Sequence, residues 1–477
     1  MRGACLGPPR NLRFRGVSLL VLLLIPLALG LSDRAPRAAA DHLCGATGSS
    51  AGPFRFTTYE AKEWRKAYTD LMELASFNRL FPQDPYFGLA PLENGVRAAR
   101  GTTAPYIPPI LLKSIAWIES VWMMADYKVL WGNIGPVLRS HDCGYGIMQL
   151  TSGMQNTTGL PTREQFLGGA HYAYNIARGA RILADKWNAA PDWRPVVGEG
   201  NPQIVEDWYF AIWGYNGFAW KNHPLNPSHP AWPRTPFSCG PPDDGFGHDR
   251  GRYPYQELVF GCAARPPQPD GQALWQGISP ALPDLSAPRI AAALTPANFE
   301  LCQQGSCGKM DITTPCTPVA PGPAPTPGPS PTPAPSCISH KDPAQPKVNP
   351  AVYLGTPTLA VEGASTIRLA PGGSATLTVR NTGPGLLPFL VIPSQPGLRV
   401  EPWQGIALGR DLGGVNAALT ITADLVVAAD EDLALAGEVR LEAATAAGSP
   451  VVIPVEVGGA GARPRPFRSF IPGLGKD

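Results

Sequence analysis

The chain carries little charge. Asp, Glu, Lys and Arg make up 16% of its 477 residues, against about 25% in an average soluble domain. The net charge is only +2 at pH 7. Because proteins that bind nucleic-acid phosphates present a clear excess of Lys and Arg, this composition argues against a nucleic-acid partner.

The ligand spacing of a zinc site is also missing. No Cys-x-x-Cys pair occurs among the nine cysteines, and the seven histidines are scattered along the chain. Structural zinc sites normally place two cysteines a few residues apart. We therefore expect no metal, and the sequence indicates no organic cofactor.

Long apolar runs are absent after residue 40, so we expect no stable membrane span beyond that point. At the N-terminus, four arginines precede the apolar run 17–31, and small residues at 38–40 offer a cleavage site. This is the layout of a secretory signal. We predict a signal peptide at 1–40 and a secreted or cell-surface, cell-wall associated protein. A retained membrane anchor is the alternative, although the run is shorter than the ~20 residues of a spanning helix.

Eight cysteines follow the one at position 5, an even number that suits disulfides in an oxidising compartment. Their pairing cannot be deduced from spacing. We expect Cys239 to pair with Cys262, and Cys302 with Cys307 to close a small loop.

Residues 54–265 are predicted to form one mainly helical domain. Capping boxes at Thr57 and Thr162 indicate helix starts. A pair of prolines precedes the apolar segment 110–119, which we expect to be a buried central helix. Apolar residues recur at helical spacing over 172–187.

The rest of the chain has a different composition. Residues 266–349 are a Pro-rich, Cys-containing linker, whose part 317–336 is expected to be an extended, semi-rigid spacer. Short apolar runs separated by turn residues over 350–457 predict an all-β sandwich. The segment 369–383 resembles exported bacterial Ig-like modules. We expect that module either to bind carbohydrate or a surface, or to serve as a spacer. Residues 458–477 are expected to be a flexible tail.

Glu119 ends the apolar segment 110–119, beside Ile118, Val121 and Trp122. A carboxyl in apolar surroundings is costly to ionise, so we expect its pKa to be raised. Such an acid can protonate a glycosidic oxygen near neutral pH. The alternative is an ordinary helix-end carboxylate in an ion pair or in solvent.

Two later stretches have the chemistry of a sugar site. Gly144 and Gly146 allow a tight backbone, and Gln149 adds an amide that donates and accepts. Tyr215 and Asn216 follow at a helix end, with a phenol and a second amide. Each stretch alone has an alternative interpretation as packing or turn chemistry.

Together and in this order, the stretches resemble the soluble lytic transglycosylase family, relatives of goose-type lysozyme. That family is marked by Glu-Ser, Gly-Leu-Met-Gln and Ala-Tyr-Asn; here the stretches are Glu-Ser at 119–120, Gly-Ile-Met-Gln at 146–149 and Gly-Tyr-Asn at 214–216. Residues 175–180 and 253–259 resemble two further family helices. The resemblance covers 105–265. It implies a multidomain chain: a mainly α, lysozyme-like catalytic domain, a Pro-rich linker and an all-β Ig-like sandwich.

The resemblance also implies an activity: an exported peptidoglycan lytic transglycosylase that cleaves the MurNAc-GlcNAc β-1,4 bond. Glu119 would be the single acid/base, and the muramic 6-hydroxyl would close a 1,6-anhydro ring without water or cofactor. The partner would be a peptidoglycan glycan strand bound by a monomer. The substrate-binding residues it implies are Gln149, Tyr215, Asn216, Ser120, Met148 and Tyr145.

Departures from the family pattern leave alternatives open. An insert separates Glu119 from Gly146 and contains Asp142. Asp142 is either a second carboxylate in the cleft or a loop residue. As a second carboxylate it could position water, and the enzyme would be a lysozyme-type hydrolase of the same bond. A non-catalytic cell-wall-binding protein is the third interpretation.

Overall fold

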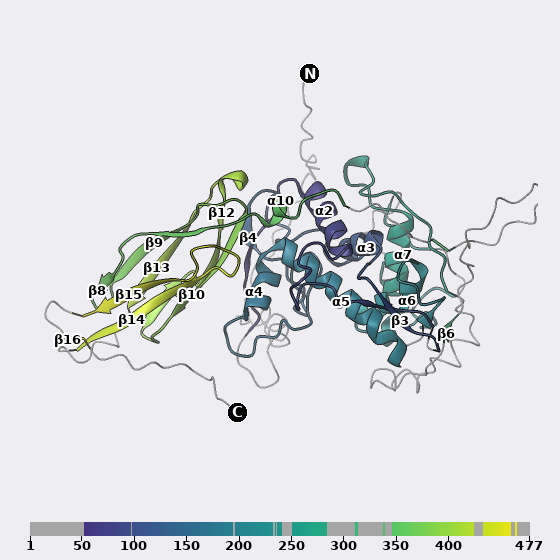
Figure 1. The fold of residues 1–477 in the computed structure, drawn as a ribbon, viewed down its shortest axis with the longest axis horizontal. Helices are drawn as coiled ribbons and strands as arrows, with labels where there is room; N and C mark the ends of the chain where they lie inside the picture. Colours follow the sequence, from purple (N-terminus) through teal and green to yellow (C-terminus); the bar gives the residue numbers. More distant parts are fainter. Residues whose placement is uncertain are drawn as a thin grey trace, which may run out of the picture.

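The computed structural model describes residues 52–96, 98–193, 196–231, 234, 236–240, 250–283, 311–312, 337–338, 346–423, 433–458 and 463–464. They form two bodies: a body of helices and short strands, purple to teal in Figure 1, and a β-sandwich, green to yellow. The predicted signal at 1–40, the spacer at 317–336 and the Cys302–Cys307 loop lie outside the described residues. No helix in the described part is long and apolar enough to cross a membrane.

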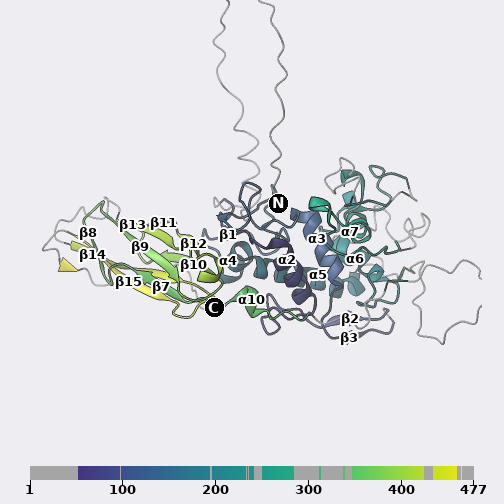
Figure 2. The same cartoon turned by 90° about the horizontal axis from the view of Figure 1, so that it is seen from above.

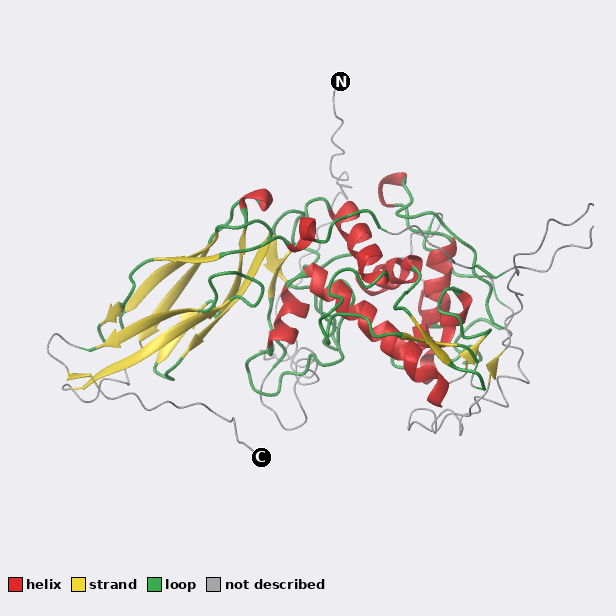
Figure 3. Ribbon diagram, viewed as in Figure 1, coloured by secondary structure: helices red, strands yellow, loops and turns green. Residues whose placement is uncertain are grey.

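The first body is built around α3, the apolar helix expected from the sequence. Leu111, Leu112 and Ile115 are fully buried, because α3 packs against α2 on one side and α7 on the other. The long helix α5 contacts α2 and α6 (Figure 3). The helices of this body are α2 (Trp64–Ser76), α3 (Pro109–Ser120), α4 (Arg163–Ala170), α5 (Tyr172–Trp193), α6 (Tyr209–Tyr215) and α7 (Tyr255–Ala264).

Three short strand pairs lie among these helices. They are β1 (Thr57–Tyr59) with β4 (Ile134–Pro136), β2 (Leu92–Asn94) with β3 (Gly101–Thr103), and β5 (Val196–Val197) with β6 (Asp311–Ile312). The first two pairs are antiparallel and the third is parallel.

The helix start predicted at Thr57 is wrong. Residues 57–59 form β1, and α2 begins only at Trp64. The polar groups expected to cap a helix point inward instead. The Thr58 hydroxyl donates to the carbonyl of Ala170 at 2.8 Å, and the Glu60 carboxylate accepts the backbone N–H of Met124 and Ala125. The capping box at Thr162 is confirmed: Thr162 and Gln165 exchange both hydrogen bonds at the start of α4.

The second body consists of two antiparallel-rich sheets that share one apolar core. One sheet has the order β12-β10-β14-β15-β8, with β16 beside β14, and the other has the order β11-β13-β9-β7. Along β9, Leu377 and Val379 are buried while their neighbours are less so, as expected for a strand with one face on a core. The strands are β7 (Leu359–Glu362), β8 (Ile367–Leu369), β9 (Ser374–Asn381), β10 (Leu386–Pro393), β11 (Leu398–Glu401), β12 (Gln404–Leu408), β13 (Ala417–Ala423), β14 (Leu433–Glu442), β15 (Val451–Val457) and β16 (Arg463–Pro464).

The sandwich is fastened to the first body through β12, which lies against β1 (Figure 2). The Gln404 side chain accepts from the Thr57 N–H at 3.1 Å and donates to the Arg55 carbonyl at 3.0 Å. Ile406 and Leu408 of the same strand are buried in the core of the first body. The segment before the sandwich, with the short helix α10 (Ala351–Leu354), runs along α2.

The fold class predicted from the sequence is wrong in its mainly α, lysozyme-like domain, whereas the β-sandwich predicted after it is present. The described residues hold seven helices beside sixteen strands, with helix and strand in roughly equal measure and mixed, curled sheets. One reason lies between α3 and α4. Val121 and Trp122 take positive φ values of 58° and 60°, which ends α3, and residues 121–162 then fold as turns, bridges and the strand β4 rather than as helix.

Candidate functional site

Side chains from α3, α5, α6 and the connecting turns converge on one cavity of about 380 Å³. Its lining is largely polar and contains two carboxylates, two ammonium groups and two side-chain amides. The cavity brings together Glu119, Gln149, Tyr215, Asn216 and Asp142 of the residues singled out from the sequence. The complete lining is Ile118, Glu119, Ser140, Asp142, Gln149, Thr151, Ser152, Ile182, Lys186, Tyr215, Asn216, Gly217 and Lys221.

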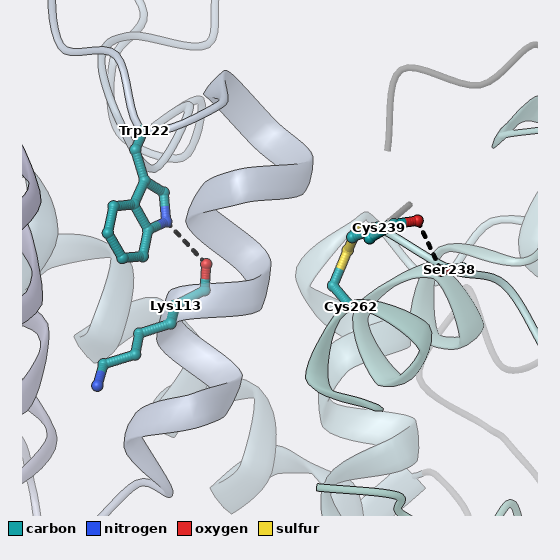
Figure 4. Close-up of a disulfide and its surroundings, with 6 residues drawn as sticks. Lys113, Trp122, Ser238, Cys239 and Cys262 are labelled. Atoms are coloured by element: carbon teal, nitrogen blue, oxygen red, sulfur yellow. Dashed lines mark hydrogen bonds between the residues drawn. A yellow bond between two sulfur atoms is a disulfide. The ribbon is translucent and has the colours of Figure 1, made fainter. Parts of the chain in front are cut away.

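Glu119 is half-buried in the last turn of α3. The helix ends immediately after it because Val121 and Trp122 adopt left-handed backbone, a conformation that costs a β-branched residue such as Val121 on the order of 1–3 kcal/mol. The fully buried Trp122 holds this turn: its indole N–H donates to the carbonyl of Lys113 at 2.9 Å (Figure 4). The strained ending places Glu119 at the cavity wall.

Tyr255 contacts the Glu119 carboxylate directly. Its hydroxyl donates to Oε1 of Glu119 at 2.5 Å. Tyr255 is the first residue of α7, which packs on α3. A donor to the charged form of a carboxyl favours that form, so this phenol stabilises Glu119 when it is ionised. From the sequence, segment 253–259 was expected only as a family helix, and Tyr255 was not predicted as a site residue.

Tyr215 lines the same cavity as Glu119. Its hydroxyl donates to the Met148 carbonyl at 2.8 Å. Burial, and then the charge of Glu119, hold the pKa of Tyr215 well above its usual value of 10. Tyr215 therefore remains a neutral phenol throughout the physiological pH range.

The turn that carries Gln149 is tightly constrained. Gln149 has φ 45°, and its amide N–H donates to the Gly146 carbonyl at 2.7 Å. The fully buried Asn175 of α5 fixes the same turn: it donates to the Tyr145 carbonyl at 2.9 Å and accepts from the Met148 N–H at 2.9 Å. A Cβ atom at Gly146, where φ is 68°, would lie 2.6 Å from Nδ2 of Asn175, so only glycine fits there.

Ser120, Tyr145 and Met148 lie behind the cavity and are absent from its lining. Ser120 is 1% exposed, and its hydroxyl donates to the Ile147 carbonyl at 2.7 Å. Tyr145 and Met148 are fully buried. These three residues join α3 and α5 to the turn and so position Glu119 and Gln149.

A relay of amides connects Asn216 to Tyr255. The Asn222 amide donates to Oδ1 of Asn216 at 2.8 Å and accepts from the backbone N–H of Tyr255 at 3.1 Å. Asn222 is only 5% exposed, and its own carbonyl accepts from the Gln256 amide at 2.9 Å. The relay sets where α7 begins, and therefore where the Tyr255 hydroxyl meets Glu119.

Asp142 is exposed and lines the cavity. Its Oδ1 accepts from the Ser140 hydroxyl at 2.5 Å, and the Ser140 oxygen accepts from the Gly144 N–H at 2.8 Å. The carboxylate is therefore oriented by its own loop and also faces the space beside Glu119.

Six lining residues were not found by sequence reasoning: Ser140, Thr151, Ser152, Ile182, Lys186 and Lys221. None of them left a clear signal. Lys186 follows the buried Ile182 by one helical turn on α5, but Asn175 and Arg178 lie on the same side of the helix, so a further polar residue there does not stand out. Within the described ranges, no cluster of three or more His, Cys, Asp or Glu could hold a metal ion.

The expected disulfide between Cys239 and Cys262 is confirmed. It ties the loop before α7 to the helix itself, close to α3 (Figure 4). Cys143 and Cys337 are also disulfide-bonded. The Cys143 bond anchors the loop next to Asp142.

No family model and no curated protein matches the chain. Solved structures similar to parts of it include WR4, an MSP family member of C. elegans, at 16% identity over 22% of this chain and 98% of that one, with a TM-score of 0.17. The periplasmic chaperone SfaE is similar at 17% identity over 22% of this chain and 59% of that one, with a TM-score of 0.19. At these TM-scores the likenesses assign no function.

The expected membership of the soluble lytic transglycosylase family is wrong. The structural neighbours are MSP, Ig-like and chaperone β-sandwich folds, and none is lysozyme-like. Short motifs such as Glu-Ser and Gly-Tyr-Asn occur in the same order as in the family. Nevertheless, no family model matches residues 105–265.

Proposed function

We propose that this protein cleaves the glycosidic bonds of peptidoglycan glycan strands outside the cytoplasm. The observation that carries the proposal is the Tyr255–Glu119 hydrogen bond at the wall of a polar cavity. Amides from Gln149 and Asn216 and the hydroxyls of Thr151 and Ser152 line the same space. Hydroxyls and N-acetyl groups of sugars pair with donors and acceptors of these kinds.

Glu119 gives its proton to the oxygen between N-acetylmuramic acid and N-acetylglucosamine, and the bond from that oxygen to the anomeric carbon breaks. The Tyr255 hydroxyl then stabilises the carboxylate that remains. In the second step the muramic 6-hydroxyl transfers its proton to Glu119, and its oxygen bonds to the anomeric carbon. The product is a 1,6-anhydro sugar, and Glu119 is protonated again.

Asp142 supports a second candidate outcome, hydrolysis. Its carboxylate lines the same cavity and, held by Ser140, could orient a water for attack on the anomeric carbon. Inverting glycosidases use two carboxyl groups in this way. The two outcomes differ by one water in the product.

The test is digestion of purified cell wall by the full chain and by Glu119→Gln, followed by mass spectrometry of the released muropeptides. We expect Glu119→Gln to lose activity at least a hundredfold while its circular dichroism and melting temperature are retained. The exposed Glu63 provides a matched control, since Glu63→Gln should keep full activity. Products with anhydro ends support ring closure, and products one water heavier support hydrolysis through Asp142. Binding of wall without release of muropeptides by the unmodified chain would overturn the enzymatic proposal and favour a wall-binding protein.

A further inference from the structure

A loop outside the Glu119 cavity exposes large apolar side chains. Of the eight large hydrophobic residues that are exposed in the described part of the chain, three lie within residues 127–131: Tyr127 at 62%, Leu130 at 72% and Trp131 at 40%. None of the three lines the Glu119 cavity. Single exposed hydrophobic residues are normal on a protein surface, whereas a group of them marks a contact site.

We propose that Trp131 and Tyr127 form a second carbohydrate site, separate from the Glu119 cavity, which binds the pyranose rings of an N-acetylated glycan. The site itself rests on the geometry of this loop. The choice of an N-acetylated glycan as its ligand rests on the proposed function.

The ring of Trp131 is supported by a second tryptophan. It stacks on Trp64, with 4.8 Å between the ring centroids and 15° between the ring planes. Trp64 in turn meets the fully buried Trp122 edge-on, with the centroids 6.1 Å apart. Within the described residues Trp131 contacts no second ring, and its indole N–H has no hydrogen-bond partner. One face of Trp131 is therefore anchored to the core, and the opposite face and the N–H are available to a ligand.

Backbone hydrogen bonds fix the loop that carries this ring. The Gly132 N–H donates to the Glu60 carbonyl at 2.8 Å, and the Glu60 N–H donates to the Asn133 carbonyl at 2.9 Å. Inside the loop, the Val129 N–H donates to the Asp126 carbonyl at 2.7 Å. Because the loop is already ordered, little conformational entropy is lost when a ligand binds to its exposed rings.

The same segment supplies polar groups beside the rings. Its residues form an open hollow of about 580 Å³, whose lining combines apolar side chains with the carboxylate of Asp126 and the ammonium of Lys128. A pyranose ring has a matching mixture, with C–H groups on its faces and hydroxyl or amide groups around its edge. The C–H face packs on an aromatic ring, while the edge forms hydrogen bonds with the polar groups.

Two other classes of partner match this loop less well. A stable protein interface takes about 20–30 residues from each side, whereas the exposed apolar side chains here fall within one short loop. A membrane surface is bound by apolar residues together with an excess of Lys and Arg. In the hollow, however, the Asp126 carboxylate offsets the charge of Lys128. A sugar ring covers one or two aromatic side chains and needs no net charge.

The experiment observes Trp131 directly in the full chain. The chain carries Glu119→Gln, so that the probe is not cleaved, and 5-fluorotryptophan in place of tryptophan. Trp131→Phe identifies the Trp131 signal in the fluorine NMR spectrum by its loss. Trp220→Phe identifies Trp220 in the same way, and this residue, next to Lys221 of the cavity lining, reports on the cavity. We expect chitohexaose, which carries no charge, to shift the Trp131 signal in a saturable manner.

A pelleting assay with insoluble chitin gives the affinity. Trp131→Ala with Tyr127→Ala should weaken chitin binding about tenfold, as expected when exposed aromatic anchors are removed. Trp131→Phe keeps a ring on Trp64 and should retain most of the binding. Leu130→Ala is the matched control: it removes the most exposed apolar side chain of the same loop but no ring, so binding should change by less than about twofold.

Several results would overturn the site. They are a Trp131 signal that does not respond to chitohexaose, an equal loss of chitin binding in Leu130→Ala, and a Trp131 signal that responds only to phosphatidylglycerol vesicles, which would indicate a membrane surface instead. Failure of the proposed cleavage is seen separately, as absence of muropeptide release by the chain with Glu119 intact. A saturable shift of the Trp131 signal supports the site whether or not that release occurs.

Discussion

The hydroxyl of Tyr255 donates a 2.5 Å hydrogen bond to Oε1 of Glu119, across 136 positions of sequence. It joins the last turn of α3 to the first residue of α7. Such a bond holds only if both helix ends are placed by other contacts: Trp122 and Ser120 place the first, and Asn222 places the second.

Tyr255→Phe removes this donor without changing the shape of the ring. A hydrogen bond to a charged group is worth about 1.5–3 kcal/mol, so we expect kcat on cell wall to fall on the order of tenfold to a hundredfold. Because Glu119 starts the reaction protonated, its pKa governs the alkaline limb of the pH–rate profile. That limb should move to higher pH, because the ionised carboxylate loses a hydrogen-bond donor. Tyr253→Phe is the control, since that ring packs against Phe237; an unchanged profile for Tyr255→Phe would contradict the assigned role.

Asn222→Ala breaks the relay that sets the start of α7. It leaves the Tyr255 N–H and the Asn216 amide without their partner in a buried place, so the free energy of unfolding should fall by about 2–3 kcal/mol. Cell-wall activity should fall as well, because Tyr255 and Asn216 both lose their fixed positions. Urea unfolding measures the first effect, and the exposed Asn133 provides a control as Asn133→Ala. Full activity in a destabilised Asn222→Ala protein would separate the relay from the site.

Two buried serines of α3 make a matched pair. Ser120→Ala leaves the Ile147 carbonyl without its donor and should cost about 1–3 kcal/mol of stability. Ser114 is equally buried, but its hydroxyl has no partner among the described residues. Ser114→Ala should therefore be neutral or stabilising. Equal melting temperatures for the two variants would show that the Ser120 bond contributes nothing.

The stability of the first body should depend on pH through Glu60. Burial raises the pKa of Glu60 from 4.5 to about 7 in the folded protein. The folded chain then keeps a proton that the unfolded chain releases, so this contribution is complete below pH 4.5 and is lost as the pH rises to about 7. The loss is at most about 3 kcal/mol. Glu60→Gln should remove it.

The measurement is the difference in unfolding free energy between the unmodified chain and Glu60→Gln at several pH values. A difference is needed because the fully buried His171 acts in the opposite sense: burial lowers its pKa from 6.5 to about 3, so its contribution is lost as the pH falls. Asp207, with its pKa raised by burial to about 8, acts in the same sense as Glu60. A constant difference between pH 4 and 8 would contradict the prediction.

Local features of this chain could be predicted from its sequence, and long-range ones could not. The apolar run at 110–119, the capping box at Thr162 and the Cys239–Cys262 bond each depend on nearby residues or on simple chemistry. Thr57 shows the limit: its capping pattern is intact, yet the burial of Thr58 and Glu60 against distant segments makes a strand of it. Tyr255 shows the same limit at the site, because nothing near it in sequence indicates Glu119.

The family motifs failed for a related reason. Short motifs at turns, such as Gly-Ile-Met-Gln, specify a local backbone that many folds can use. Here Gly146 and Asn175 do require that backbone, but the segment between α3 and α4 has no helix. Motif order therefore indicated candidate residues better than it indicated the fold.

The side chain of Gln404 reaches out of the sandwich and binds the backbone on either side of Phe56. Ile406 and Leu408 are buried beside it, and the approach segment is held on α2, where the Tyr353 hydroxyl donates to Asp70. The sandwich therefore has a fixed orientation relative to the opening of the Glu119 cavity. If the sandwich bound an extended surface, the opening would be presented to that surface at one angle. The distance from the surface at which the Glu119 opening acts would then be fixed by the contact between the two bodies. It would not depend on the volume that a flexible linker can explore.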